Sequence, residues 1–307
     1  MNSRENFFSG YDINDIHDWY VDLASSIEIL SGNNSTASKL LIYYLTPDKQ
    51  KKDPNIIELC KNDIAQQNKK DGTSNYFGND VNKNAGTYEI DSLYLEKIKK
   101  YTDYASLMKE FLDIFLSKKD KTKGIANHFL KNDLTEEYKL TYYKSTGFSI
   151  STKRKLLSIA GKLGVGSILS EKEKNELDVY VGLNSFVIKS EVTIKVTDII
   201  CNEINSSETL IQGVVKSIKV SIMSWKNKLF DYYDFDADIG FPLPNPHYEN
   251  GKIHPERKNI SFDELQHDNL VKMANLKPPL ANPFYVYKEF FETSPDLLVK
   301  DFLVTLK

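Results

Sequence analysis

The feature that most constrains the fold of this chain is a change in the spacing of its apolar residues. Up to about residue 140, apolar residues recur every three or four positions, which is the period of an amphipathic helix. Beyond Val179 the chain is rich in β-branched residues, and short segments alternate between apolar and polar side chains. Such alternation is typical of half-buried strands. The spacing therefore predicts a helical first part and a second part that contains a sheet.

Four segments of the first part carry the helical spacing: residues 12–30, 37–46, 55–68 and 92–120. Asp12 is the expected N-cap of the first, because its side chain can accept from free amide groups of the first turn. The second should end at Pro47, which cannot continue a helix. Residues 69–86 are rich in Gly, Asn, Asp and Lys, and they predict a long loop.

The second part is expected to form a mostly antiparallel sheet. The clearest strand is "EVTIKV", in which Val192 and Ile194 alternate with polar residues. Further strands are expected within 210–225, 284–291 and 297–306. In the first of these segments the apolar residues fall out of phase, which predicts a bulge near Lys216.

One more helix is expected in the second part, over residues 261–276. Ser261 and Glu264 have the spacing of a capping box at its start. Together, these segments predict an α+β fold in which helices flank the sheet. We expect a mainly helical domain over 1–146 and an α+β domain over 147–307.

Composition excludes several classes of protein. The chain has 307 residues, with 40 basic and 43 acidic side chains and a formal charge of -3. The overall charge therefore does not favour binding to nucleic acid. Two cysteines, Cys60 and Cys201, are too few for a disulfide framework or a cysteine zinc site. No signal peptide is apparent, and no apolar run approaches the roughly 20 residues of a membrane span. We expect a soluble protein made in the cytoplasm, without a transmembrane segment.

The segment "KLFDYYDFDADIGFPLPNPHYENGKIHPER", residues 228–257, holds the candidate chemistry. Alternation along a strand would place Asp231 and Tyr233 on one face. If the strand ends at Asp234, the side chains of Asp231, Tyr233 and Asp234 can all reach one pocket. Clustered carboxylates favour a bound cation, and Mg²⁺ prefers oxygen ligands such as Asp234 and Asp236. A second interpretation stays open, in which the aspartates only turn the chain at a strand end.

Basic and imidazole groups follow the acidic cluster. His254 and Arg257 could bind a phosphate or transfer a proton, and His247 could bind substrate. The Asp234–Asp236 pair is also compatible with a metal site of the glycosyltransferase type. An EF-hand loop is excluded, because Ile239 stands where glycine is required. The segment "GKLGVGS" lacks the lysine of a phosphate-binding loop.

The sequence "DYYDF" resembles the Asp-x-Tyr-Asp core of the colicin M family of antibacterial toxins, and Asp231, Tyr233 and Asp234 match that core. The resemblance implies a helical domain before an α/β domain with a curved, mostly antiparallel sheet. It also implies Mg²⁺-dependent hydrolysis of lipid II, a lipid-linked peptidoglycan precursor, between the undecaprenyl chain and its pyrophosphate. The family's His-Arg pair is absent at its usual spacing, where Gly240 and Phe241 stand instead.

Carried over to this chain, the resemblance makes Asp234 the main ligand or base. Asp231 and Tyr233 would shape the pocket, and His254 with Arg257 would act on the phosphate. Such an effector would reach the periplasm of a target cell through a secretion machinery other than the general export route. It would also have an immunity protein as a partner.

A non-enzymatic function is the alternative. The segment "LLSIAGKLGVGSIL", Leu156 to Leu169, combines a basic lead with small and apolar residues, as membrane-active helices do. A partner-binding or structural protein without a catalytic site would also fit most of the chain.

Overall fold

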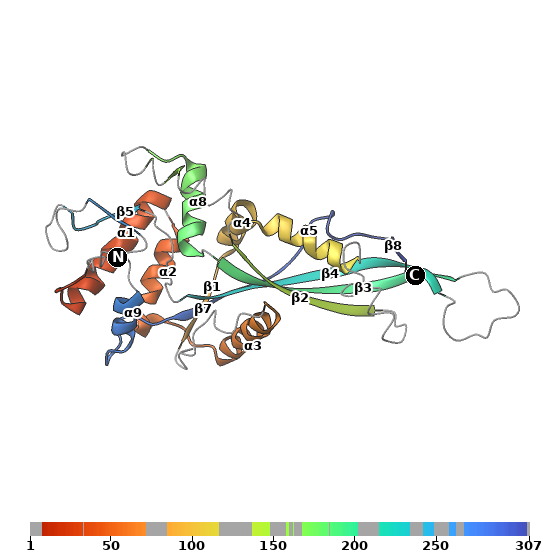
Figure 1. The fold of residues 1–307 in the computed structure, drawn as a ribbon, viewed down its shortest axis with the longest axis horizontal. Coiled ribbons are helices and arrows are strands. Elements are labelled where there is room, and N and C mark those ends of the chain that lie inside the picture. Colours follow the sequence, from red (N-terminus) through yellow and green to blue (C-terminus); the bar gives the residue numbers. More distant parts are fainter. Residues whose placement is uncertain are drawn as a thin grey trace, which may run out of the picture. The chain divides into compact units, whose positions relative to one another are not determined.

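The computed structural model describes residues 8–32, 34–71, 85–116, 137–147, 158–159, 162, 168–183, 185–201, 215–233, 242–248, 258–261 and 267–305. Helices and a mixed sheet of six strands form an α+β fold with helices in the N-terminal region, which confirms the predicted fold class (Figure 1).

The helices within the described part of the chain are α1 (Ile13–Ser31), α2 (Thr36–Tyr44), α3 (Pro54–Asp71), α4 (Ser92–Tyr101), α5 (Tyr104–Phe115), α8 (Glu171–Gly182) and α9 (His267–Ala274). A short 3-10 helix, η1 (Pro47–Lys49), follows α2. Asp12 caps α1 as predicted, because its carboxylate accepts a hydrogen bond from the Asn14 amide at 2.8 Å. Ser35, Asp91 and Ser170 cap α2, α4 and α8 in the same way.

One helix prediction needs correction. The single helix expected over 92–120 is broken after Tyr101, because Thr102 adopts an extended conformation and separates α4 from α5. Of the helix expected over 261–276, the structure describes α9, from His267 to Ala274. Residues 262–266 lie outside the described residues, and Ser261 is the last residue of β6, where its backbone pairs with Pro242.

The strands are β1 (Gly86–Glu89), β2 (Glu137–Gly147), β3 (Ser185–Cys201), β4 (Val215–Tyr233), β7 (Phe284–Phe291) and β8 (Phe302–Thr305). Their order is β1-β7-β4-β3-β2, and β8 also pairs with β4. The β4–β8 pair is antiparallel, as expected, but β1 runs parallel to β7. A separate pair joins β5 (Pro242–Pro244) to β6 (Asn259–Ser261).

The burial pattern of β4 changes phase within the strand. Ile218, Val220 and Ile222 are buried, and the next buried residues in alternation are Trp225, Asn227 and Leu229. The phase therefore shifts by one residue between Ile222 and Trp225, as a bulge would cause. The side chain at Lys216, where the sequence predicts a bulge, lies outside the described side chains.

The chain divides into two compact units, and each combines three segments. Unit 1 contains Met1–Asp103, Gly147–Phe186 and Phe230–Lys288, and unit 2 contains Tyr104–Thr146, Val187–Leu229 and Glu289–Lys307. The predicted domains 1–146 and 147–307 stay a prediction.

The two units have different cores. In unit 1, α1, α2 and α8 pack together around buried side chains such as Trp19, Tyr20 and Leu40. In unit 2, Phe115 of α5 packs edge-on against Trp225 of β4 and Tyr142 of β2. Among the described helices, none is long and apolar enough to cross a membrane.

Candidate functional site

The Asp-x-Tyr-Asp core lies at the end of β4, in unit 1. The strand ends at Tyr233, which is buried, and Asp231 on the same strand is half-buried. Asp234, Asp236, His254 and Arg257 lie outside the described residues. The structure thus describes Asp231 and Tyr233 of the core, at the end of β4.

Aromatic rings from two other elements hold Tyr233. Its ring stacks on Phe284 of β7, with centroids 4.9 Å apart and planes 24° apart. The Tyr44 ring of α2 lies edge-on at 6.1 Å. Burial raises the pKa of Tyr233 well above its ordinary value, and Tyr44 and Asp231 raise it further. The phenol therefore stays neutral at physiological pH, so its part in any chemistry is to shape the site rather than to act as an anion.

The preceding residue packs separately. The ring of Tyr232 lies 5.0 Å from that of Tyr285, the β7 neighbour of Phe284. Side chains alternate along a strand, so these two tyrosines anchor opposite faces of the end of β4. This double contact holds the end of β4 against β7.

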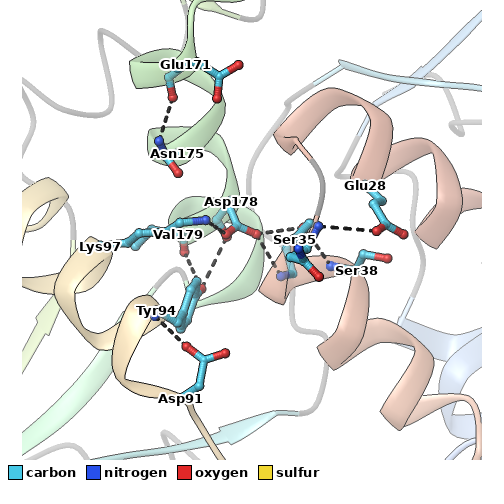
Figure 2. A network of polar contacts seen from close by, with 12 residues as sticks. Glu28, Ser35, Ser38, Asp91, Tyr94, Lys97, Glu171, Asn175, Asp178 and Val179 are labelled. Atoms are coloured by element: carbon cyan, nitrogen blue, oxygen red, sulfur yellow. Dashed lines mark hydrogen bonds and ion pairs between the residues drawn. The ribbon is translucent and has the colours of Figure 1, made fainter.

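A buried carboxylate that sequence reasoning missed lies in the same unit (Figure 2). Asp178 of α8 is fully buried. One carboxylate oxygen, Oδ1, accepts hydrogen bonds from Ser35 Oγ at 2.7 Å and from the Ala37 amide at 3.0 Å. The other, Oδ2, pairs with Lys97 Nζ of α4 at 2.7 Å. Asp178 therefore joins the start of α2 to both α4 and α8.

Tyr94 lies between this network and the end of β4. Its hydroxyl is 3.3 Å from the Asp178 carbonyl oxygen and 3.4 Å from that of Val179, and it donates toward them (Figure 2). Burial raises the pKa of Tyr94 well above its ordinary value. The charge of Asp178, then Tyr233 and the charge of Asp231, act in the same direction. Tyr94 is therefore a buried phenol that remains neutral.

The sequence does contain a signal for Asp178. Asp178 stands between the apolar residues Leu177 and Val179 in the sequence, and the structure buries every residue from Glu176 to Gly182. A charge in such a stretch needs a partner, because an unpaired buried charge is costly. The identity of that partner was not readable, since Ser35 is 143 positions away.

His247 contacts a different element. It follows β5, is buried, and places Nε2 2.7 Å from Asp22 Oδ2 of α1. This is an ion pair when the imidazole is protonated, although the contact lacks hydrogen-bond geometry. Nearby, Asn245 Oδ1 accepts a hydrogen bond from Trp19 Nε1 at 2.9 Å. The structure therefore shows His247 in a link between the β5–β6 pair and α1, and its assignment to substrate binding stays a prediction.

The described residues contain no group of three or more His, Cys, Asp or Glu side chains that could hold a metal ion. Asp178 is already engaged by Lys97, Ser35 and Ala37. Asp234 and Asp236, the expected Mg²⁺ ligands, are not among the described residues.

Comparisons of the chain with family models, with curated proteins and with solved structures find no significant match.

Proposed function

We propose that the chain is an antibacterial effector that hydrolyses a lipid-linked pyrophosphate, lipid II, and so blocks peptidoglycan synthesis. One observation supports this proposal: β4 ends at Tyr233, and that tyrosine contacts the rings of Tyr44 and Phe284. Asp234 follows Tyr233 directly in the sequence, after this packed end of the strand. A catalytic carboxylate needs such support, because small errors in its position slow the reaction.

In this proposal each residue of the segment has a separate role. Asp234 is the main base or ligand, and Asp231 and Tyr233 shape the pocket. His254 and Arg257 act on the phosphate. Water cleaves the bond between the undecaprenyl chain and the pyrophosphate, leaving a hydroxyl on each product. A carboxylate can take the proton of that water, and a guanidinium can bind the charge that develops on phosphate oxygen.

We further propose that Mg²⁺ would be held by Asp234 and Asp236, as carboxylate oxygens are its preferred ligands. The described residues do not supply the rest of a ligand set, so no step of the reaction is assigned to the ion. Secretion into the periplasm of a target cell and an immunity protein in the producing cell belong to the same proposal.

The test is expression of the chain in a Gram-negative host, with and without a periplasmic signal. We expect lysis only with the signal, and we expect Asp234→Ala to abolish it while the protein remains folded. Asp296→Ala, at an exposed aspartate, is the matched control and should still lyse cells. Purified protein with lipid II should release undecaprenol, and Asp234→Ala should not.

Equal growth with wild-type and Asp234→Ala protein in the periplasm would contradict the proposal. Lysis that ignores the substitution and occurs from either compartment would favour a membrane-active protein. Harmless expression in both compartments would favour a binding or structural protein.

A further inference from the structure

The contact between Tyr44 and Tyr233 joins the end of β4 to α2. Tyr44 is the last residue of α2 and is 2% exposed, and its ring meets that of Tyr233 at an interplanar angle of 62°. Tyr233 also contacts the Phe284 ring, which is fully buried and stacks on it at an interplanar angle of 24°. Two rings from distant segments thus limit the positions open to Tyr233.

The same two segments are joined by backbone. The Asn282 amide donates to the Tyr44 carbonyl oxygen at 2.9 Å, and Asn282 lies two residues before Phe284. This bond ties the end of α2 to the start of β7. Tyr44 and Phe284, which both contact the Tyr233 ring, therefore lie on directly connected segments.

A pair of side-chain amides, Gln50 and Asn282, reinforces this connection. Gln50 Nε2 donates to the carbonyl oxygens of Asn282 at 2.7 Å and of Tyr43 at 2.9 Å. In return, Asn282 Nδ2 donates to Gln50 Oε1 at 2.7 Å. Both side chains are buried, where well-paired amides specify one arrangement because the alternatives leave polar groups unsatisfied.

The space around this amide pair is closely filled. A Cβ at Gly86 would lie 2.5 Å from Gln50 Oε1 and 2.9 Å from Gln50 Cβ. A side chain at this position would push Gln50 away from Asn282. The sequence thus provides a residue without a side chain where the amide pair needs room.

We propose that Tyr44 is a positioning residue for the candidate catalytic end of β4, and that the Gln50–Asn282 amide pair holds it in place. This inference rests on the proposed function. Tyr44 would act through Tyr233, by ring contact, and not on substrate. The prediction is specific, because the contact with Tyr233 is made by the aromatic ring.

The test measures hydrolysis of lipid II by purified full-length variants. In Tyr44→Leu we expect kcat to fall about tenfold or more, because a displaced strand end misplaces the reacting group. We expect KM to stay within about twofold, since substrate contacts are retained. Tyr44→Phe keeps the ring, so its kcat and KM should match those of the wild type.

The matched control is Tyr142→Leu, which removes a buried tyrosine ring in unit 2. It should lower stability and leave kcat unchanged. The inference is overturned if Tyr44→Leu retains wild-type kcat, or if Tyr142→Leu lowers kcat equally.

A second measurement is independent of activity. 3-Fluorotyrosine placed at position 233 gives one ¹⁹F NMR line. Its chemical shift in the folded wild type should differ from that of the protein unfolded in urea. Tyr44→Leu should broaden this line or move it toward the unfolded position, and Tyr44→Phe should not. An unchanged line in Tyr44→Leu would overturn the inference about Tyr44. Absence of hydrolysis by the wild type would instead overturn the proposed function.

Discussion

Tyr94 and Tyr233 are phenols placed where ionisation is unfavourable. Burial is the largest cause of their raised pKa values, and neighbouring Asp178 and Asp231 add to it. A tyrosine in an unfolded chain has a pKa of about 10. Above that pH the unfolded chain loses phenol protons that the folded protein retains, so the unfolded state binds fewer protons and is favoured.

The free energy of unfolding should therefore be insensitive to these two phenols below about pH 9 and fall as pH rises above about 10. Each phenol should contribute a slope of about 1.4 kcal/mol per pH unit while it stays protonated in the folded state. Urea titrations between pH 8 and pH 11 measure this slope. It should be smaller in the variant Tyr94→Phe/Tyr233→Phe.

Absorbance at 295 nm provides the control, because it detects tyrosinate. Exposed tyrosines should titrate in the folded protein, whereas Tyr94, Tyr233 and other buried tyrosines such as Tyr20 should titrate only as it unfolds. Equal slopes in wild type and the double variant would show that solvent reaches Tyr94 and Tyr233 before unfolding.

Among the elements, α8 is fixed at both ends. At its start, Ser170 and Glu173 form a capping box. Hydrogen bonds from Lys162 and then from the Ser170 backbone and hydroxyl lower the pKa of Glu173 to about 2. At its end, Gly182 lies so close to α2 and α4 that a Cβ there would be 2.3 Å from Tyr94 Oη and 3.3 Å from Ala37 Cα.

This close approach predicts the effect of adding one methyl group. Gly182→Ala should destabilise the protein by about 2 kcal/mol, because overpacking forces rigid neighbours to move. Tyr94→Phe removes the nearest atom, so the double variant should lose less stability than the sum of the two single variants. A double-mutant cycle by urea unfolding measures this coupling. Strict additivity would mean that the Tyr94 hydroxyl is not the obstacle.

The elements also show what the sequence could predict. Local signals were sufficient for α1 and its Asp12 cap, and for the strands that contain Val192 and Phe284, because spacing and capping depend on neighbours in the chain. Contacts between distant segments were not predictable. The strand position of Ser261, for example, depends on its pairing with Pro242.

The same limit applies to the candidate site. The motif pointed to Asp231 and Tyr233 and suggested a strand end there. It gave no sign that Tyr44 and Phe284 hold Tyr233, since those rings come from segments far away in the chain. Asp178 stands between apolar residues in the sequence, but it was not predicted as part of the site, and nothing there identified Lys97 as its partner.

At the scale of the whole molecule, the two tryptophans of the chain divide between the two units. Trp19 of unit 1 donates to Asn245, and Trp225 of unit 2 donates to Asn227. Both are fully buried, so the fluorescence of each should report the packing of its own unit. Trp225→Phe protein would report unit 1, and Trp19→Phe protein would report unit 2.

Asp178 makes it possible to perturb one unit selectively. Asp178→Ala leaves the Ser35 hydroxyl and the Ala37 amide without their acceptor and Lys97 without its counterion. We expect a loss of about 3 kcal/mol in the unfolding transition seen by Trp19. Asp48→Ala, at an exposed aspartate of the same unit, should change it by less than about 0.5 kcal/mol.

The transition seen by Trp225 decides how far the units depend on each other. All the contacts that Asp178→Ala removes lie inside unit 1, which favours a smaller shift for Trp225. Strands β3, β4 and β7 each continue from one unit into the other, and this continuity favours a common transition. We expect the local contacts to dominate. In the variant, the transition seen by Trp19 should then have its midpoint at a lower urea concentration than the transition seen by Trp225. Identical shifts of the two transitions would instead show that the strands make the molecule unfold as one cooperative whole.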